Sequence, residues 1–425
     1  MKLLIYNHLG LVPGNNSPYS HSVWIPKSSF TGFIIDEIHN SFSKHYDRID
    51  LVIDETLEYS GALHHQTSQI SKSEVSQERR IALYSQSDTL SSSIIAVIRN
   101  LPKNAFRIFI PSNDKENAAK PLVAENIPFE KLDYNAIERY KPDVILVLND
   151  WSKRARGLIA LGHKYDIPTI CLQESIISFG DAAKRMERSD YVMVQGLQTL
   201  NHLRQNHYFL TGNPRYVHSE LPSTRQLAII NCNFTYDVQE EHRYKWLDSV
   251  VNELEKIHYP YQILQHPRDR GDLSNFKNVI ASSSVSISTH LQKGSLVISR
   301  FSSLLHEGIA HGRPSVYFNP HQEELTYDFT PDNKVMFYSE SEEELGQILL
   351  KLKNNHTASK SDFRTYLIRH CFHPNLSAAR LIADILMEAP MTIQKKQAGD
   401  IIVQYLYHPS VRTVVEKLKN TGLSK

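Results

Sequence analysis

Two short segments carry residue types that could hold a phosphate or another anion. In "LQHPRDR", His266 ends an apolar run, Pro267 fixes the turn, and Arg268 adds a positive charge. In "SRFSSLLHEG", Ser302 and Ser303 follow an apolar run and open a periodic segment. Serine caps a helix there, and the free N–H groups of a helix start favour an anion. A solvated loop and plain N-capping explain each segment taken alone, so the anion site depends on their combination.

A cysteine stands at the end of another apolar run. In "LAIINCNFTYD", the apolar residues predict a buried strand, and Cys232 follows between Asn231 and Asn233. Asparagine is a poor strand former and a good loop former, so the strand is predicted to end at Cys232. The local pattern alone is best explained by an inert, half-buried small residue.

Two carboxylates end strands in the first half of the chain. Glu174 follows the apolar run of "ICLQES", and Asp150 ends the run of "VLNDW". A carboxylate at such a strand end is a candidate general base for a hydroxyl group, with Glu174 first and Asp150 second. The competing explanation for Glu174 is a salt-bridged or helix-capping carboxylate. Asn319 ends a later run and is a candidate nucleotide contact, with turn formation as the simpler explanation.

The sequence predicts neither a metal site nor a disulfide framework. Its three cysteines, Cys171, Cys232 and Cys371, are an odd, widely spaced set without a CxxC pair. The acidic "DRGD" segment lacks a matched set of ligands. We therefore expect no metal ion, no resident cofactor and a reducing compartment.

The composition is that of a globular protein with balanced charge. The 425 residues predict two or three domains, and the net charge of +1 gives nucleic-acid binding no electrostatic support. The first apolar run, in "MKLLIYNHLGLVPG", is too short for a secretory signal, and no run is long enough to span a membrane. We therefore expect a cytoplasmic protein that binds no nucleic acid.

Strands that alternate with helices must position the candidate residues. Near-continuous apolar runs alternate with amphipathic segments over 81–215 and again over 225–385, which is typical of parallel sheets covered on both faces. The sequence predicts an α/β fold with two Rossmann-like domains, and ligands at the strand ends that face an inter-domain cleft. A strand–helix–strand extension over 1–80, with a polar loop at 60–80, is expected to pack on the first domain. Residues 386–425 are expected to form a helical tail.

A family resemblance rests on the combination of these segments. A strand-end His–Pro followed by a strand, two serines and a helix resembles the donor site of two-domain bacterial CMP-sugar glycosyltransferases, which include sialyltransferases and Kdo (3-deoxy-D-manno-oct-2-ulosonic acid) transferases. "LTGNPR" and "ICLQES" are similar to inter-domain segments of surface-polysaccharide enzymes with this architecture. Over essentially all 425 residues, the chain resembles the retaining β-Kdo transferases that form N-terminal domains of O-antigen synthases.

The resemblance implies a donor, an acceptor and a reaction. The fold would be a modified glycosyltransferase-B-like arrangement. It would move β-Kdo from CMP-β-Kdo to the non-reducing end of an O-antigen chain in lipopolysaccharide biosynthesis, through a covalent Kdo–enzyme adduct. His266, Arg268 and the serines at 302 and 303 would hold the CMP phosphate. Further domains of a larger, membrane-associated synthase are implied partners, which would place the chain at the cytoplasmic face of the inner membrane.

The chain departs from the family at the nucleophile. An aspartate stands in the family pattern where this sequence has Cys232. The resemblance implies that Cys232 is a substituted nucleophile facing the cleft. Asn231 and Asn233 flank it and are candidates to orient it or bind the sugar, and the strand-end carboxylates Glu174 and Asp150 remain the candidate general bases. A thiolate attacks well, but a thioglycoside-like adduct breaks slowly, so poor transfer is expected.

Three alternatives stay open from the sequence. A CMP-sialic-acid transferase would use a similar donor, because both sugars are 2-keto acids activated by CMP, and binding of each CMP-sugar separates the two. A sugar-nucleotide 2-epimerase shares the two-domain fold, and UDP release or interconversion without acceptor would support it. A non-catalytic module that binds a polysaccharide chain is the third, and absence of CMP binding would favour it.

Overall fold

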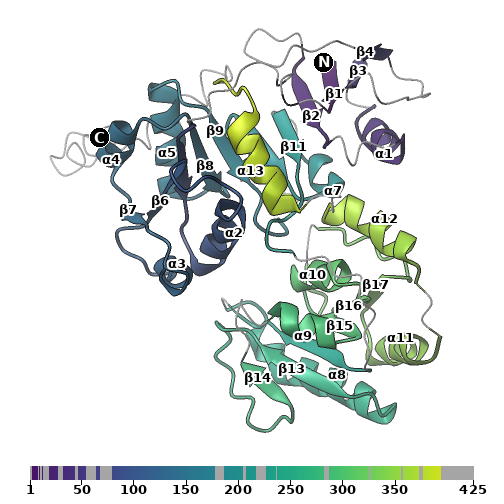
Figure 1. Cartoon of the computed structure of the whole chain (residues 1–425). Coiled ribbons are helices and arrows are strands. Elements are labelled where there is room, and N and C mark those ends of the chain that lie inside the picture. Colours follow the sequence, from purple (N-terminus) through teal and green to yellow (C-terminus); the bar gives the residue numbers. More distant parts are fainter. Residues whose placement is uncertain are drawn as a thin grey trace, which may run out of the picture. The chain divides into compact units, whose positions relative to one another are not determined.

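The computed structural model describes residues 2–7, 9, 12, 19–26, 32–43, 46–53, 64–67, 79–177, 186–203, 207–216, 226–235, 237–281, 287–324, 327–355, 358–372 and 377–393. The chain divides into two compact units: unit 1 is Met1–Arg215 with Pro374–Lys425, and unit 2 is Tyr216–His373. Each unit is built around its own parallel sheet (Figure 1). The two Rossmann-like α/β domains predicted from the sequence are therefore confirmed.

Unit 1 contains an 11-stranded sheet with the order β4-β3-β1-β2-β11-β10-β9-β8-β5-β6-β7. Its strand pairings are parallel. The strands are β1 (Lys2–Tyr6), β2 (His21–Trp24), β3 (Arg48–Ile53), β4 (His64–Thr67), β5 (Ile81–Tyr84), β6 (Phe106–Ile110), β7 (Glu130–Lys131), β8 (Val144–Leu148), β9 (Thr169–Leu172), β10 (Tyr191–Val194) and β11 (His207–Leu210). The central strands are buried along their whole length, as their unbroken apolar runs predict.

Helices connect most of these strands, and three of the helices begin at a side chain that caps them. Ser87 caps α2, Asp133 caps α4 and Ser152 caps α5, each by accepting a backbone N–H of the first turn. The described helices of unit 1 are α1 (Gly32–Phe42), α2 (Asp88–Ile98), α3 (Ala119–Ala124), α4 (Tyr134–Tyr140), α5 (Lys153–Lys164), α7 (Leu197–Leu200) and α13 (Ala378–Glu388). Those that lie between successive strands supply the crossover connections that parallel strands require.

The N-terminal extension continues the sheet of unit 1. Strands β1, β2 and β3 pair in parallel, and β2 also pairs with β11, so the prediction of a segment packed on the first domain understates the connection. The polar loop predicted over 60–80 is wrong at His64–Thr67, which forms the edge strand β4. An edge strand tolerates polar side chains, which hides it from a search for apolar runs.

Helix α13 belongs to unit 1, which corrects the predicted second domain of 225–385. Leu381, Ile382, Ile385 and Leu386 lie in the same hydrophobic core as the strands of unit 1. In Figure 1, α13 (yellow-green) lies among the blue and teal elements of that unit. After α13, the carbonyl oxygen of Ala389 accepts a hydrogen bond from Arg79 over 2.7 Å. The predicted tail of 386–425 begins inside α13, and residues 394–425 lie outside the described residues.

Unit 2 contains a 6-stranded parallel sheet with the order β14-β13-β12-β15-β16-β17. The strands are β12 (Ala228–Cys232), β13 (Tyr261–Gln265), β14 (Val279–Ala281), β15 (Leu296–Ser299), β16 (Ser315–Phe318) and β17 (Met336–Ser339). The helices are η3 (Glu240–His242), α8 (Arg243–Lys256), α9 (Ile287–Lys293), α10 (Leu304–Ala310), α11 (Glu342–Asn355) and α12 (Lys360–His370). Strands β12 and β15 lie side by side although β13 and β14 separate them in the chain. They therefore form the switch point at which open α/β sheets bind ligands.

Candidate functional site

At the carboxyl edge of the unit 2 sheet, the two predicted anion-binding segments follow β13 and β15, which are the neighbours of β12 on either side. Cys232 ends β12 and Asn233 follows it, His266 follows β13, and the turn of 302–303 follows β15. The His266 N–H donates to the Cys232 carbonyl oxygen over 2.9 Å. The Asn233 amide donates to the Phe301 carbonyl oxygen over 3.4 Å. Because parallel strands end at the same edge, these residues border the switch point of unit 2.

Cys232 ends β12 as predicted, but its side chain is buried. It is 0% exposed and lies in the core with Ile230 and Phe234. Its thiol donates to Oδ2 of Asp269 over 3.3 Å. Burial, and then the Asp269 carboxylate, raise the pKa of the Cys232 thiol far above its ordinary value. Cys232 is thus more deeply buried than the half-buried residue that its local pattern predicts, and an attacking role for Cys232 stays a prediction from the family resemblance.

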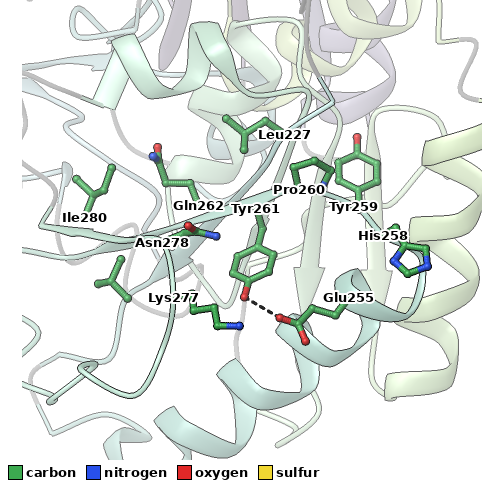
Figure 2. A pocket seen from close by; sticks show the side chains of 11 residues that line it. Leu227, Glu255, His258, Tyr259, Pro260, Tyr261, Gln262, Lys277, Asn278 and Ile280 are labelled. Atoms are coloured by element: carbon green, nitrogen blue, oxygen red, sulfur yellow. Dashed lines mark hydrogen bonds between the residues drawn. The ribbon is translucent and has the colours of Figure 1, made fainter.

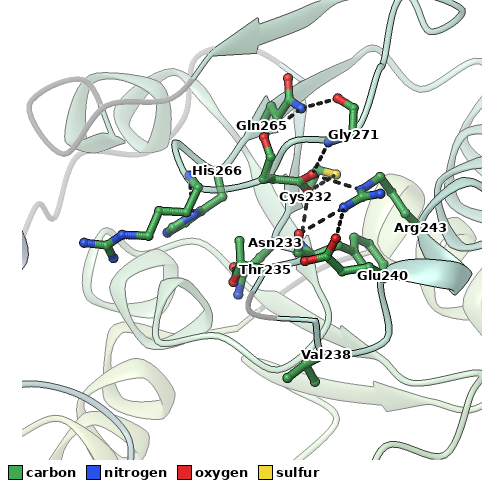
Figure 3. A network of polar contacts seen from close by, with 12 residues as sticks. Cys232, Asn233, Thr235, Val238, Glu240, Arg243, Gln265, His266 and Gly271 are labelled. Atoms are coloured by element: carbon green, nitrogen blue, oxygen red, sulfur yellow. Dashed lines mark hydrogen bonds and ion pairs between the residues drawn. The ribbon is translucent and has the colours of Figure 1, made fainter. Parts of the chain in front are cut away.

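Asp269 is the centre of a buried polar network. Figure 3 labels its partners Cys232, Arg243 and Gly271. Its Oδ2 accepts the N–H of Phe234 over 3.1 Å, and its Oδ1 accepts the N–H of Gly271 over 2.9 Å. Arg243 Nε lies 2.9 Å from Oδ1, and both side chains are buried. Arg243 Nη2 reaches the Phe234 carbonyl oxygen over 3.1 Å and Glu240 over 3.2 Å. One ion pair thus links the end of β12, the loop after β13 and the start of α8.

His266 is oriented by its own turn. Its Nδ1 accepts the backbone N–H of Arg268 over 3.1 Å, so the neutral ring carries its proton on Nε2. The N–H of Asp269 donates to the His266 carbonyl oxygen over 2.8 Å, which closes the turn. His266 and Arg268 are both half-buried. A fixed Nε2–H donor at a strand end suits a phosphate oxygen.

Ser302 and Ser303 have different roles at the start of α10. Ser302 Oγ accepts the N–H of Leu304, the first residue of α10, over 3.1 Å, so plain capping explains Ser302. Ser303 occupies the N-cap position, and its side chain accepts no hydrogen bond from the helix. Its carbonyl oxygen accepts the Tyr216 hydroxyl over 3.4 Å. The Ser303 hydroxyl is half-buried and is not needed by the cap.

A second buried ion pair fixes the loop after β12. Arg300 directly follows β15 and is 6% exposed. Its Nε donates to Glu323 Oε2 over 3.1 Å, and its Nη2 pairs with the other carboxylate oxygen. Its Nη1 donates to the carbonyl oxygens of Asn233 over 2.8 Å and Val238 over 3.2 Å. The loop that carries Asn233 is therefore held on both sides, by Arg300 and by Arg243.

Two further predicted amides have structural partners. Asn231 donates to Ser299 Oγ over 2.9 Å and joins β12 to β15. Asn319 accepts the N–H of Glu323 over 2.8 Å and donates to the Tyr338 hydroxyl over 3.3 Å. Asn319 thus makes a turn, the simpler of the two explanations given above. A nucleotide contact by either amide stays a prediction.

The two candidate general bases, Asp150 and Glu174, lie in unit 1, and each forms an ion pair with an arginine. Asp150 is 0% exposed, accepts the N–H of Arg188 over 2.7 Å and pairs with its guanidinium at 3.2 Å. Glu174 pairs with Arg215 at 2.9 Å, and its carbonyl oxygen accepts the Asn213 amide over 2.7 Å. Burial gives Asp150 a structural role, because a base must reach a hydroxyl group. Glu174 is the salt-bridged carboxylate of the competing explanation, and its catalytic role stays a prediction.

A cavity of about 990 Å³ opens at the opposite edge of the unit 2 sheet (Figure 2). Its lining comes from the residues that precede β12, β13 and β14, together with the start of β13 and of β14. One hydrogen bond, from the Tyr261 hydroxyl to Glu255 over 3.1 Å, crosses it. This is the amino end of the strands, so the cavity is separate from the switch-point residues.

The described ranges contain neither a metal-binding cluster nor a membrane-spanning helix. No three His, Cys, Asp or Glu side chains in these ranges are grouped so that they could hold a metal ion. No helix within the same ranges combines the length and the apolar character needed to cross a membrane.

Helix α10, which starts at the serine turn, contains a buried histidine without a hydrogen-bond partner. His306 is 0% exposed, and neither ring nitrogen is paired. The rings of Tyr327, Phe329, Tyr366 and His370 surround it, with centroids 5.3 to 5.8 Å away. Burial lowers the pKa of His306 to about 3. The neutral ring is therefore a core side chain that links α10 to α12.

Unit 2 is expected to lose stability in acid through His306. Its folded pKa lies below the unfolded value of about 6.5, so its contribution is complete above that pH and is lost as the pH falls toward 3. The free energy of unfolding should fall by up to about 1.4 kcal/mol per pH unit from this group. When the free energy of unfolding is measured in urea from about pH 7.5 to 5, its slope against pH should be smaller in His306→Phe than in the unchanged chain. His258→Asn, at an exposed site, should leave that slope unchanged. Equal slopes in all three proteins would contradict this assignment.

Sequence reasoning missed Asp269, Arg243 and Arg300. A charged residue near a strand end gives no sign of its partner, because buried ion pairs join residues that are distant in the chain. One signal was present in Gly271, where any side chain would collide with Arg243. A glycine in a polar turn marks such a close approach.

Comparisons with known proteins show the fold. No protein-family model matches the sequence, and no curated protein matches it. The structure is similar to a UDP-N-acetylglucosamine 2-epimerase, described as putative, from Listeria monocytogenes (TM-score 0.54, 12% identity, 72% of this chain and 96% of that chain). It is also similar to the UDP-GlcNAc 2-epimerase from Neisseria meningitidis bound to UDP-GlcNAc (0.53, 12%, 72% and 99%) and to the glycotransferase of kitacinnamycin (0.51, 13%, 73% and 100%). At these identities, the shared feature is the glycosyltransferase-B-like pair of Rossmann-like domains.

Proposed function

We propose that the chain is a glycosyltransferase that uses CMP-β-Kdo and transfers β-Kdo, with retention, to the end of an O-antigen chain. The observation that carries the proposal is the switch point of unit 2, where His266 and the serine turn border the same strand, β12. An Nε2–H donor and the Ser303 hydroxyl suit a phosphate whose negative charge grows as CMP leaves. The choice of CMP and Kdo rests on the family resemblance.

The fold comparisons support a sugar-nucleotide substrate only in a general way. One compared structure contains UDP-GlcNAc and another is named as a glycotransferase. A 2-epimerase is therefore the second candidate, because two of the three compared structures are named as UDP-GlcNAc 2-epimerases. The two candidates differ in the nucleotide, CMP or UDP, and in the need for an acceptor.

Calorimetry with the full chain tests the proposal. CMP should bind, and UDP and UDP-GlcNAc should bind more weakly or not at all. Because protein groups are proposed to stabilise the leaving charge, added EDTA should leave CMP binding unchanged. Tighter binding of UDP-GlcNAc, with interconversion in the absence of an acceptor, would replace the transferase with the epimerase. Absence of binding by any nucleotide would favour a non-catalytic polysaccharide-binding module.

His266→Ala should lower the use of CMP-β-Kdo by roughly 10²-fold, as for the loss of one group that stabilises developing charge. The donor-dependent release of CMP measures this effect. His258→Asn is a matched control, because His258 precedes β13 at the opposite edge of the sheet and is exposed. Near-normal CMP release by His266→Ala would remove His266 from the donor site.

A further inference from the structure

The charged group in direct contact with the Cys232 thiol is a carboxylate, and the two nearby cations are each engaged by carboxylates of their own. Asp269 accepts its hydrogen bond over 3.3 Å, and the two nearby cations are Arg243 and Arg300. Arg243 is already shared between Asp269 and Glu240. Arg300 is paired with a carboxylate of its own, Glu323, as described above. Two guanidinium groups therefore face three carboxylates, and the carboxylate in contact with sulfur opposes a thiolate.

The geometry also fixes the direction of the thiol. Asp269 has no rotational freedom, because both of its oxygens accept backbone N–H groups and Arg243 braces Oδ1. A sulfur that donates to Oδ2 must lie on the core side of β12, where its neighbours Ile230 and Phe234 are fully buried. A donor sugar at the carboxyl edge of the sheet would meet Asn233 and His266 before it met this sulfur.

We infer that Asp269, held by Arg243, is a positioning residue that keeps the Cys232 side chain protonated and turned into the core. Only the effect of Asp269 on the reaction rests on the proposed function. With a CMP-sugar donor, the sulfur–carbon bond would form as the anomeric carbon–oxygen bond breaks, and the electron pair would leave with CMP. The thiol proton would first have to pass to water, and the resulting thiolate would lie against the Asp269 carboxylate. Asp269 therefore slows the first displacement by Cys232.

Asp269→Asn tests the inference in the full chain without any sugar nucleotide. The S–H stretching band in the Raman spectrum should move to higher frequency, because the amide is a weaker acceptor than the carboxylate. Labelling of Cys232 by a small neutral thiol reagent, measured by peptide mass spectrometry relative to the buried Cys371, should become at least about threefold faster. That factor corresponds to one pKa unit, after allowing for the lower nucleophilicity of a more acidic thiol.

Two further variants separate this effect from damage to the fold. Glu240→Gln removes the other carboxylate on Arg243 without contacting sulfur, so band and relative rate should stay unchanged. If Asp269→Asn alone does not fold, the double variant Asp269→Asn with Arg243→Gln removes both charges of the buried pair, leaves only the partly exposed Glu240 without its cation, and should still shift the band upward. An unchanged band together with an unchanged relative rate, in a folded variant that lacks Asp269, would overturn the inference.

A third measurement connects Asp269 to the proposed reaction. In a Cys232→Asp background, two carboxylates would lie close together, and the nucleophile would hold its proton to higher pH. Adding Asp269→Asn should move the acid limb of the transfer rate to lower pH. If no chain binds CMP, the proposed function fails while the band and the labelling rate still decide the role of Asp269. An acid limb that does not move would restrict Asp269 to a packing role and overturn the inference.

Discussion

Cys232→Asp should raise transfer from CMP-β-Kdo by about 10³-fold or more, with the β configuration retained. Aspartate can attack the anomeric carbon and then leave when the acceptor arrives. Cys232 itself is held protonated, and its thioglycoside-like adduct would break slowly. The rate of Kdo transfer to an O-antigen oligosaccharide, with NMR of the new linkage, measures both parts of the expected result.

The unchanged chain and an isosteric variant complete this test. With the donor alone, the Cys232 chain should slowly gain the mass of one Kdo, and excess acceptor should not remove it. Cys232→Asn matches aspartate in size but lacks the carboxylate, and it should stay inactive. Full activity of the cysteine chain, or an inactive Cys232→Asp, would end the nucleophile assignment. Cys232 would then be a small core residue at a strand end.

Arg300→Met should destabilise unit 2 by about 3–5 kcal/mol. The change leaves Glu323 buried without its cation, and it removes the donors to the carbonyl oxygens of Asn233 and Val238. Breaking a buried pair is expensive because the remaining charge stays out of water. Urea unfolding followed by Trp246 fluorescence measures the effect, in a background with phenylalanine at Trp24 and Trp151.

Lys256→Met is the matched surface control for Arg300→Met. Lys256 also pairs with a glutamate, Glu253, but the lysine side chain is 64% exposed, so the change should cost far less stability than Arg300→Met. Adding Glu323→Gln to Arg300→Met should recover part of the loss, because no unpaired charge then remains buried. Equal effects of Arg300→Met and Lys256→Met would show that burial of the Arg300 pair contributes nothing.

The sequence by itself determined the local architecture. Apolar runs that are buried on both faces predicted the central strands, and serines before periodic segments predicted helix starts. His266, Cys232 and the serine turn each come at the end of an apolar run, so each was expected at the carboxyl end of a strand. In a parallel sheet these ends lie at one edge. These signals lie within a few residues of the feature that they predict, so one sequence is enough to find them.

Only the tertiary structure decided which residues meet. It placed α13 in the core of unit 1, although the chain reaches this helix after passing through unit 2. It also turned Cys232 into the core and joined it to Asp269, in the loop after β13, and through Asp269 to Arg243, at the start of α8. Apolar periodicity predicts that a face will be buried, but it does not identify the element that covers that face. A charged residue likewise gives no sign of its partner when the partner lies in a distant segment. Packing between distant segments therefore chose the partners, and with them the protonation state of the Cys232 thiol.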